Sequence, residues 1–152
     1  SYSFTAVNKR AAGLGSRYYI RMGAARKVSD KPKVIDYHDY RLFLKDWFSF
    51  LEHNVHGFSL RQLAREAKVG VSFLSMMLSG RRGLSETMFH KISPHLRLSE
   101  KDLELLGLLR ALEEAESAQA RLHVFSQIQK RPEYRERYHK EFEVFTYLTS
   151  WY

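Results

Sequence analysis

The stretch "SLRQLAREAKVGVSFLSMMLSG" constrains the fold more than any other part of the chain. Ser59 opens a segment in which apolar residues recur at helical spacing, and its hydroxyl can accept from a first-turn amide while Gln62 reaches back, as in a capping box. The tripeptide "KVG" then leads into a second apolar segment, from about Ser72 to Leu78. Gly80 follows it as a left-handed helix cap. The pattern predicts two short helices joined by a tight turn.

Helical periodicity continues on both sides of this unit. The preceding segment predicts a helix of about four turns, ended by residues 54–57. Its apolar stripe consists of Tyr40, Phe43, Leu44, Trp47, Phe48 and Leu51. Ser85 and Ser99 stand at N-cap positions, Pro94 should end the helix between them early, and the residues after Ser99 form one long helix or two. No strand of alternating pattern is found, so we predict an all-α fold with additional C-terminal helices.

The central unit resembles the helix-turn-helix of the phage-repressor (Cro-like) family. That family pairs Leu-Ala on its second helix with a Gly after its third, and Leu63-Ala64 and Gly80 have this spacing. The resemblance implies a five-helix domain that binds double-stranded DNA. It places Val71, Ser72, Phe73, Ser75, Met76 and Ser79 at the exposed reading positions of the third helix. It also places Arg61, Arg65, Arg81 and Arg82 where basic side chains could contact phosphates.

The predicted reading helix lacks the side chains that usually distinguish bases. Specific contacts need Arg for guanine or Asn and Gln for adenine, and this helix offers three serines instead. Phe73 and Met76 could pack on thymine methyl groups, insert at a base step, or be buried by another helix or a dimer partner. The alternative function is therefore a protein–protein interaction module on a helix-turn-helix scaffold, with Phe73 and Met76 as its apolar contact.

A second resemblance covers most of the chain beyond Asp36. The segments "YHDYRLFLKDWF", "FSLRQLAREAKVGVSFLSMMLSGRRGLSE" and "YLTSWY" are similar to a Bdellovibrio- and Fibrobacter-type paralogous family of transcriptional regulators. In that family an amino-terminal helix-turn-helix precedes a carboxy-terminal domain of unknown function, and a Trp-Tyr pair lies near the junction. The resemblance implies a bacterial DNA-binding regulator of which this chain is the amino-terminal fragment.

The net charge is distributed unevenly along the chain. The net charge is +8, and residues 1–35 hold eight cations against the single anion Asp30, so 8 − 1 = +7 of it lies there. Residues 59–98 carry seven more cations against Glu66 and Glu86. A basic patch of this kind is typical of a phosphate-binding surface. We expect a flexible basic arm at 1–35, at most with a transient helix near residues 18–22, a helix-turn-helix domain at 36–116, and a helical extension at 117–152.

Other functional classes find little support in the sequence. The chain has no cysteine, which excludes thiol catalysis and Cys-ligated zinc, and its histidine pairs lack the partners of a metal site. Glu113, Glu114 and Glu116 are interpreted as a solvated helix face rather than catalytic carboxylates. No apolar run approaches the ~18 residues of a membrane span. We expect a cytoplasmic protein that is not an enzyme and needs no cofactor or metal.

The C-terminal segment carries an apolar stripe that could join two copies of the chain. The stripe comprises Tyr134, Tyr138, Phe142, Phe145 and Leu148, with Leu122, Phe125 and Ile128 before it. Helix-turn-helix proteins often bind paired half-sites as symmetric dimers. Because Pro132 breaks the helical pattern, we expect the stripe to swing clear and form a homodimer. Packing back onto the first helix is the competing use.

Overall fold

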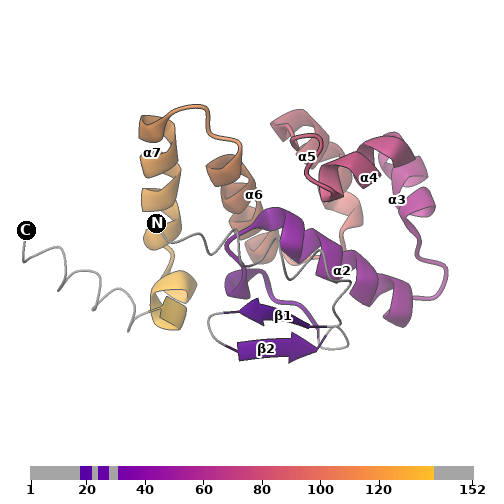
Figure 1. Ribbon diagram of the computed structural model, residues 1–152, viewed down its shortest axis with the longest axis horizontal. Coiled ribbons are helices and arrows are strands. Elements are labelled where there is room, and N and C mark those ends of the chain that lie inside the picture. Colours follow the sequence, from indigo (N-terminus) through magenta and orange to yellow (C-terminus); the bar gives the residue numbers. More distant parts are fainter. Residues whose placement is uncertain (1–17, 22–23, 28–30, 139–152) are drawn as a thin grey trace, which may run out of the picture.

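The structure is a computed structural model that describes residues 18–21, 24–27 and 31–138. Within these ranges the packed part of the chain is all-helical, as predicted, and a short strand pair precedes it. After the strands and a 3-10 turn, η1 (Val34–Asp36), the elements run α2 (Tyr40–Asn54), α3 (Leu60–Ala67), α4 (Val71–Leu78), α5 (Glu86–Ile92), η2 (Ser93–His95), α6 (Glu100–Glu113) and α7 (Ala118–Gln129). Figure 1 shows α2 crossing the centre of the molecule, with α3, α4 and α5 towards the right of the view and α6 and α7 towards the left.

Helix α2 supplies the centre of the hydrophobic core. All six residues of its predicted apolar stripe are buried, which confirms the sequence interpretation. The Asp39 side chain caps the helix by accepting from the Arg41 amide at 2.8 Å. Trp47 packs in this core, where its ring stacks on Phe43 with centroids 5.8 Å apart. Its indole N–H donates to the Leu96 carbonyl at 2.7 Å, so α2 is also tied to the turn after α5 through a buried polar contact.

Helices α3 and α4 form the predicted pair with a tight turn. Ser59 caps α3 by accepting from the Gln62 amide, whereas the Gln62 side chain donates to Glu66 instead of completing the capping box. Lys68, rather than a glycine of the turn, takes the left-handed conformation with φ 57°. The Val69 amide donates to the Ala64 carbonyl at 3.0 Å, which is the six-to-one bond of a Schellman motif. The turn therefore consists of a helix cap followed at once by the next helix.

The remaining helices also begin and end close to their sequence signals. Ser85 and Ser99 cap α5 and α6, and the α5 helix ends at Ile92, just before Pro94. The segment after Ser99 forms two helices, because Ser117 caps a separate α7 that packs against α6. No helix in the described ranges is both long and apolar enough to cross a lipid bilayer.

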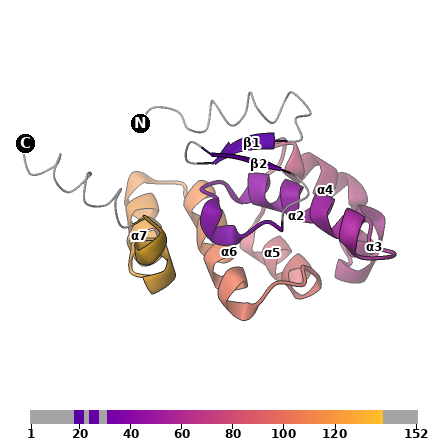
Figure 2. The same ribbon diagram turned by 90° about the horizontal axis from the view of Figure 1, so that it is seen from below.

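The basic arm contains a β-hairpin, so the expectation of a helix near residues 18–22 and of no strands was wrong. Strand β1 (Tyr18–Arg21) pairs antiparallel with β2 (Ala24–Lys27), with Tyr19 opposite Arg26. The residues "YYI" favour a strand, but four residues are too few for an alternating pattern to be recognised. Figure 2 shows the hairpin alongside the helical body. Most of the arm lies outside the described residues.

Three of the five described residues of the predicted C-terminal stripe pack into the same chain, whereas Leu122 and Phe125 are exposed. Ile128, Tyr134 and Tyr138 are buried in the common core, so they do not swing clear of it as expected. Residues 132–138 are helical, and the Tyr138 hydroxyl donates to the Ile35 carbonyl at 2.5 Å. Arg137 pairs with the buried Asp36 at 3.2 Å. The break at Pro132 therefore redirects the chain back onto η1. Phe142, Phe145 and Leu148 lie outside the described residues.

Candidate nucleic-acid interface

The outer face of α4 carries three exposed serines. Ser72, Ser75 and Ser79 are exposed, and at 3.6 residues per turn they occupy the middle of one arc that spans about 140°. Exposed Val71 lies at one edge of this arc and half-buried Met76 at the other. Of the six reading positions predicted from the resemblance, these five lie on the outer face. We call these five residues the reading arc.

Phe73 is the exception, because its side chain is buried and cannot reach a base or a partner. Only 8% of it is exposed, and it joins the core with Leu74 and Met77 from the inner face of α4. The guanidinium carbon of Arg82 lies 5.6 Å from its ring centroid and covers it from outside. Assigning Phe73 to an exposed position was therefore wrong. The apolar contact proposed for a protein-interaction module loses one of its two residues.

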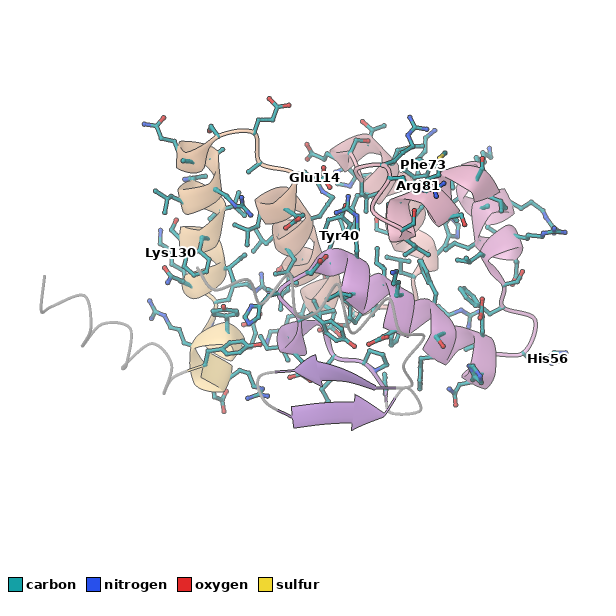
Figure 3. The ribbon with its side chains drawn as sticks, in the orientation of Figure 1. Tyr40, His56, Phe73, Arg81, Glu114 and Lys130 are labelled. Atoms are coloured by element: carbon teal, nitrogen blue, oxygen red, sulfur yellow. The ribbon has the colours of Figure 1, made fainter. Side chains whose placement is uncertain are left out.

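Four exposed arginines belong to the segments that adjoin α4 in the sequence. Arg61 and Arg65 lie one turn apart on α3, and Arg81 and Arg82 follow Gly80 in the loop after α4; all four are exposed. Among the residues that the structure describes, none of the four makes an ion pair. Their charge is therefore not neutralised within the described chain. Figure 3 shows Arg81 on the α4 side of the molecule, far from Lys130 at the end of α7.

The main chain of the basic loop is held in one conformation by its own helix cap. Gly80 has φ 83°, and its amide donates to the Met77 carbonyl at 3.1 Å. The Arg81 amide donates to the Met76 carbonyl at 2.9 Å, which gives α4 a Schellman ending like that of α3. The Arg82 amide is 3.3 Å from the same carbonyl, and the Ser79 hydroxyl also donates to it, at 2.9 Å. The loop that carries the two arginines is thus folded tightly onto the end of the helix.

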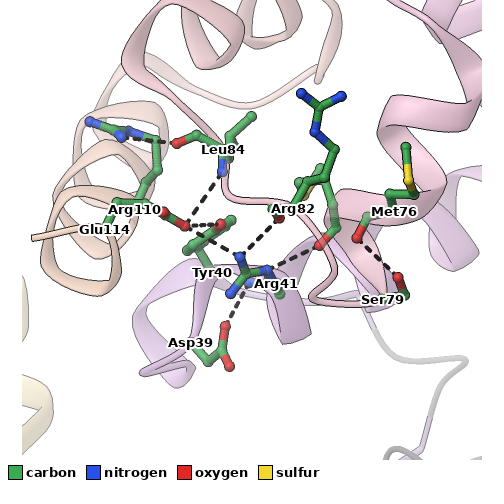
Figure 4. Close-up of polar contacts among 10 residues, drawn as sticks. Asp39, Tyr40, Arg41, Met76, Ser79, Arg82, Leu84, Arg110 and Glu114 are labelled. Carbon is green, nitrogen blue, oxygen red and sulfur yellow. Dashed lines mark hydrogen bonds and ion pairs between the residues drawn. The ribbon is translucent and has the colours of Figure 1, made fainter.

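A cluster of polar side chains under the loop fixes it to α2 and α6 (Figure 4). We call Tyr40, Arg41, Leu84, Arg110 and Glu114 the Glu114 cluster. One carboxylate oxygen of Glu114 accepts from the Tyr40 hydroxyl at 2.6 Å, from Arg41 at 3.3 Å and from the Leu84 amide at 3.4 Å. Arg110 donates to the Leu84 carbonyl at 3.0 Å. Three elements far apart in the sequence therefore meet at a single carboxylate.

Arg41 connects this cluster to the basic loop through main-chain atoms. Its Nε donates to the Met77 carbonyl at 3.0 Å, and its Nη2 donates to the Arg82 carbonyl at 3.1 Å. Because both acceptors belong to the backbone, the position of the loop does not depend on the side chains of Arg81 and Arg82. The Arg81 side chain remains available for contacts outside the chain, whereas that of Arg82 lies over the Phe73 ring.

Sequence reasoning missed this support. It interpreted Glu114 as part of a solvated helix face, but Glu114 is only partly exposed and accepts three hydrogen bonds. Burial, reinforced by the hydrogen bond to Glu114, raises the pKa of Tyr40 above its ordinary value of 10.0, so Tyr40 stays a neutral donor. The one residue near the loop that hints at this contact is Gly83, because a Cβ at that position would come within 2.5 Å of a Glu114 carboxylate oxygen.

Comparison of the chain with protein-family models, with curated proteins and with solved structures gave no match in any of the three.

Proposed function

We propose that the chain is a DNA-binding transcriptional regulator that acts in the cytoplasm and docks α4 in the major groove of double-stranded DNA. The observation that carries the proposal is the set of four exposed arginines without ion pairs in the described chain, two on α3 and two in the loop that follows α4, the helix with the reading arc. Arginines in this arrangement can neutralise phosphates on either side of an inserted helix. Their contacts supply affinity and orientation but little sequence choice.

The Glu114 cluster supports this proposal because it pre-organises the basic loop. A loop that is already ordered loses less conformational freedom when it binds a phosphate. The serines of the reading arc can donate to phosphates or to bases, which agrees with a helix that approaches DNA closely. Burial of Phe73 removes the observation that favoured a protein-interaction module, so we do not propose that function.

The proposal is tested by duplex binding of the full chain at several salt concentrations. The variant Arg81→Gln/Arg82→Gln removes two charges while keeping a shorter polar side chain beside Phe73. We expect weaker binding to every duplex sequence. The plot of log affinity against log salt should become less steep by roughly 1.8, about 0.9 for each phosphate that is no longer neutralised. Fluorescence anisotropy with labelled synthetic duplexes measures both quantities.

A matched control separates local contacts from total charge. Arg121→Gln/Lys130→Gln makes the same charge change on α7, where both residues are exposed, and Figures 1 and 2 show α7 at the opposite end of the molecule from α4. This variant should keep the salt dependence of the wild type. Undetectable duplex binding at low salt, or an equal effect of the two double variants, refutes the proposal.

We also propose that the regulator binds as a homodimer. Since Ile128, Tyr134 and Tyr138 are buried in the protomer, the contact must use other surface. Leu122 and Phe125 on α7 remain exposed, at 69% and 36%. Sedimentation of the full chain should show an association that Leu122→Ser/Phe125→Ser weakens. A monomer at all concentrations contradicts the dimer while leaving DNA binding to be judged by its own test.

A further inference from the structure

We infer that the base chemistry read by α4 is the C5-methyl group of thymine, contacted by Val71 and Met76. The inference rests on the proposed function and adds the class of target: duplexes with thymine under the reading arc. The inference follows from the side chains of α4 that remain accessible at the surface.

The reading arc offers only two kinds of side chain. Its three serines can each donate and accept, so each can bond to more than one base and distinguishes them poorly. It holds no guanidinium, amide or carboxylate group, so the bidentate contacts that identify guanine or adenine and the carboxylate acceptor that prefers cytosine are absent from it. Apolar contact is therefore the only selective chemistry that the arc can provide.

Val71 and Met76 are the side chains that can make such a contact. Every other apolar residue of α4 belongs to the core or packs against it, whereas these two do not. Val71 is 41% exposed although it is a large hydrophobic residue, and it is the first residue of α4. Residues near the start of a recognition helix are the ones that contact base edges. An exposed valine at this position can pack on a methyl group in the major groove.

The charges around the arc favour DNA over an apolar protein as the occupant. Arg61 and Arg65 on α3, and Arg81 and Arg82 in the loop after α4, lack acidic partners in the described chain. A purely apolar partner would leave these four charges near its edge without compensation. The major groove instead presents thymine methyl groups between two rows of phosphates.

Replacing thymine with uracil removes only the methyl group and so tests the inference directly. Affinities of the full chain are measured for an alternating A·T duplex and for the same duplex with uracil. We expect about fourfold weaker binding to the uracil duplex for each methyl group that is buried. Because this replacement can also alter groove shape, alternating G·C duplexes with and without 5-methylcytosine are measured too. The methyl group on cytosine occupies the corresponding position in the groove, and it should strengthen binding.

Two variants assign the effect to the side chain. The double variant Val71→Ser/Met76→Ser should bind thymine and uracil duplexes almost equally, whereas Ser75→Ala, a change on the same arc that spares the apolar residues, should keep the preference for the methyl group. Circular dichroism checks that both variants are folded. Duplex binding without any methyl preference, or a preference that survives in Val71→Ser/Met76→Ser, overturns the inference but not the proposed function. Failure of all duplexes to bind overturns both.

Discussion

The carboxylate of Glu114, the residue that follows α6, should stabilise the fold more than the carboxylate of any acidic residue within that helix. In Glu114→Ala, the Tyr40 hydroxyl, which donates over 2.6 Å to Glu114, loses its acceptor inside the core. An unsatisfied buried hydroxyl costs about 1–3 kcal/mol. Arg41 loses its ion pair as well, but it keeps its bonds to Met77 and Arg82.

The ion pair adds a smaller contribution, because its two side chains remain 18% and 28% exposed. The Leu84 amide lies 3.4 Å from the carboxylate, so that hydrogen bond is long and contributes little. Together these changes should lower the free energy of unfolding by about 2–4 kcal/mol. Glu114→Gln keeps an acceptor for Tyr40 and should lower it by about 1–2 kcal/mol.

Urea unfolding followed by circular dichroism measures these differences. Glu116→Ala is the control, since Glu116 is exposed and makes no ion pair in the described chain. Hydrogen exchange adds a local measurement: the amides of residues 80–84 should exchange faster in Glu114→Ala. If that variant unfolds within about 0.5 kcal/mol of the wild type, the cluster does not support the loop as we argue.

The same geometry leads to three further predictions. Gly83→Ala should displace the Glu114 carboxylate and cost about 1–3 kcal/mol in unfolding experiments, and a stability equal to the wild type would contradict the close approach. Lys68→Gly should stabilise the chain by about 0.5–1 kcal/mol, because Lys68 has φ 57° and Gly adopts this region without strain; Lys68→Val should be destabilising in the same assay. Since the folded state raises the pKa of Tyr40 above 10.0, the stability from neutral Tyr40 is fully present below that pH and is lost as pH rises beyond it. Tyr40→Phe should reduce this loss in alkaline unfolding experiments.

Local features of the fold were predictable and long-range ones were not. Ser59, Ser85 and Ser99 were recognised as N-caps because capping involves residues three positions apart, and the structure confirms all three. Phe73 was assigned to the wrong face because its position was taken from a family pattern, whereas on this helix it lies with Leu74 and Met77. The Tyr40–Glu114 bond joins residues 74 positions apart, and nothing in the local sequence of either residue indicates the other.

Arg41 holds the basic loop through its main chain, so the conformation of the loop does not depend on the side chains at positions 81 and 82. Arg41 binds the carbonyl oxygens of Met77 and Arg82, which are present whatever side chains those positions carry. The residues at 81 and 82 can therefore be exchanged while the path of the chain stays the same. Engineering of this surface can accordingly vary the charge and chemistry of two adjacent side chains on an unchanged backbone, provided that Arg41, Gly83 and Glu114 are left intact.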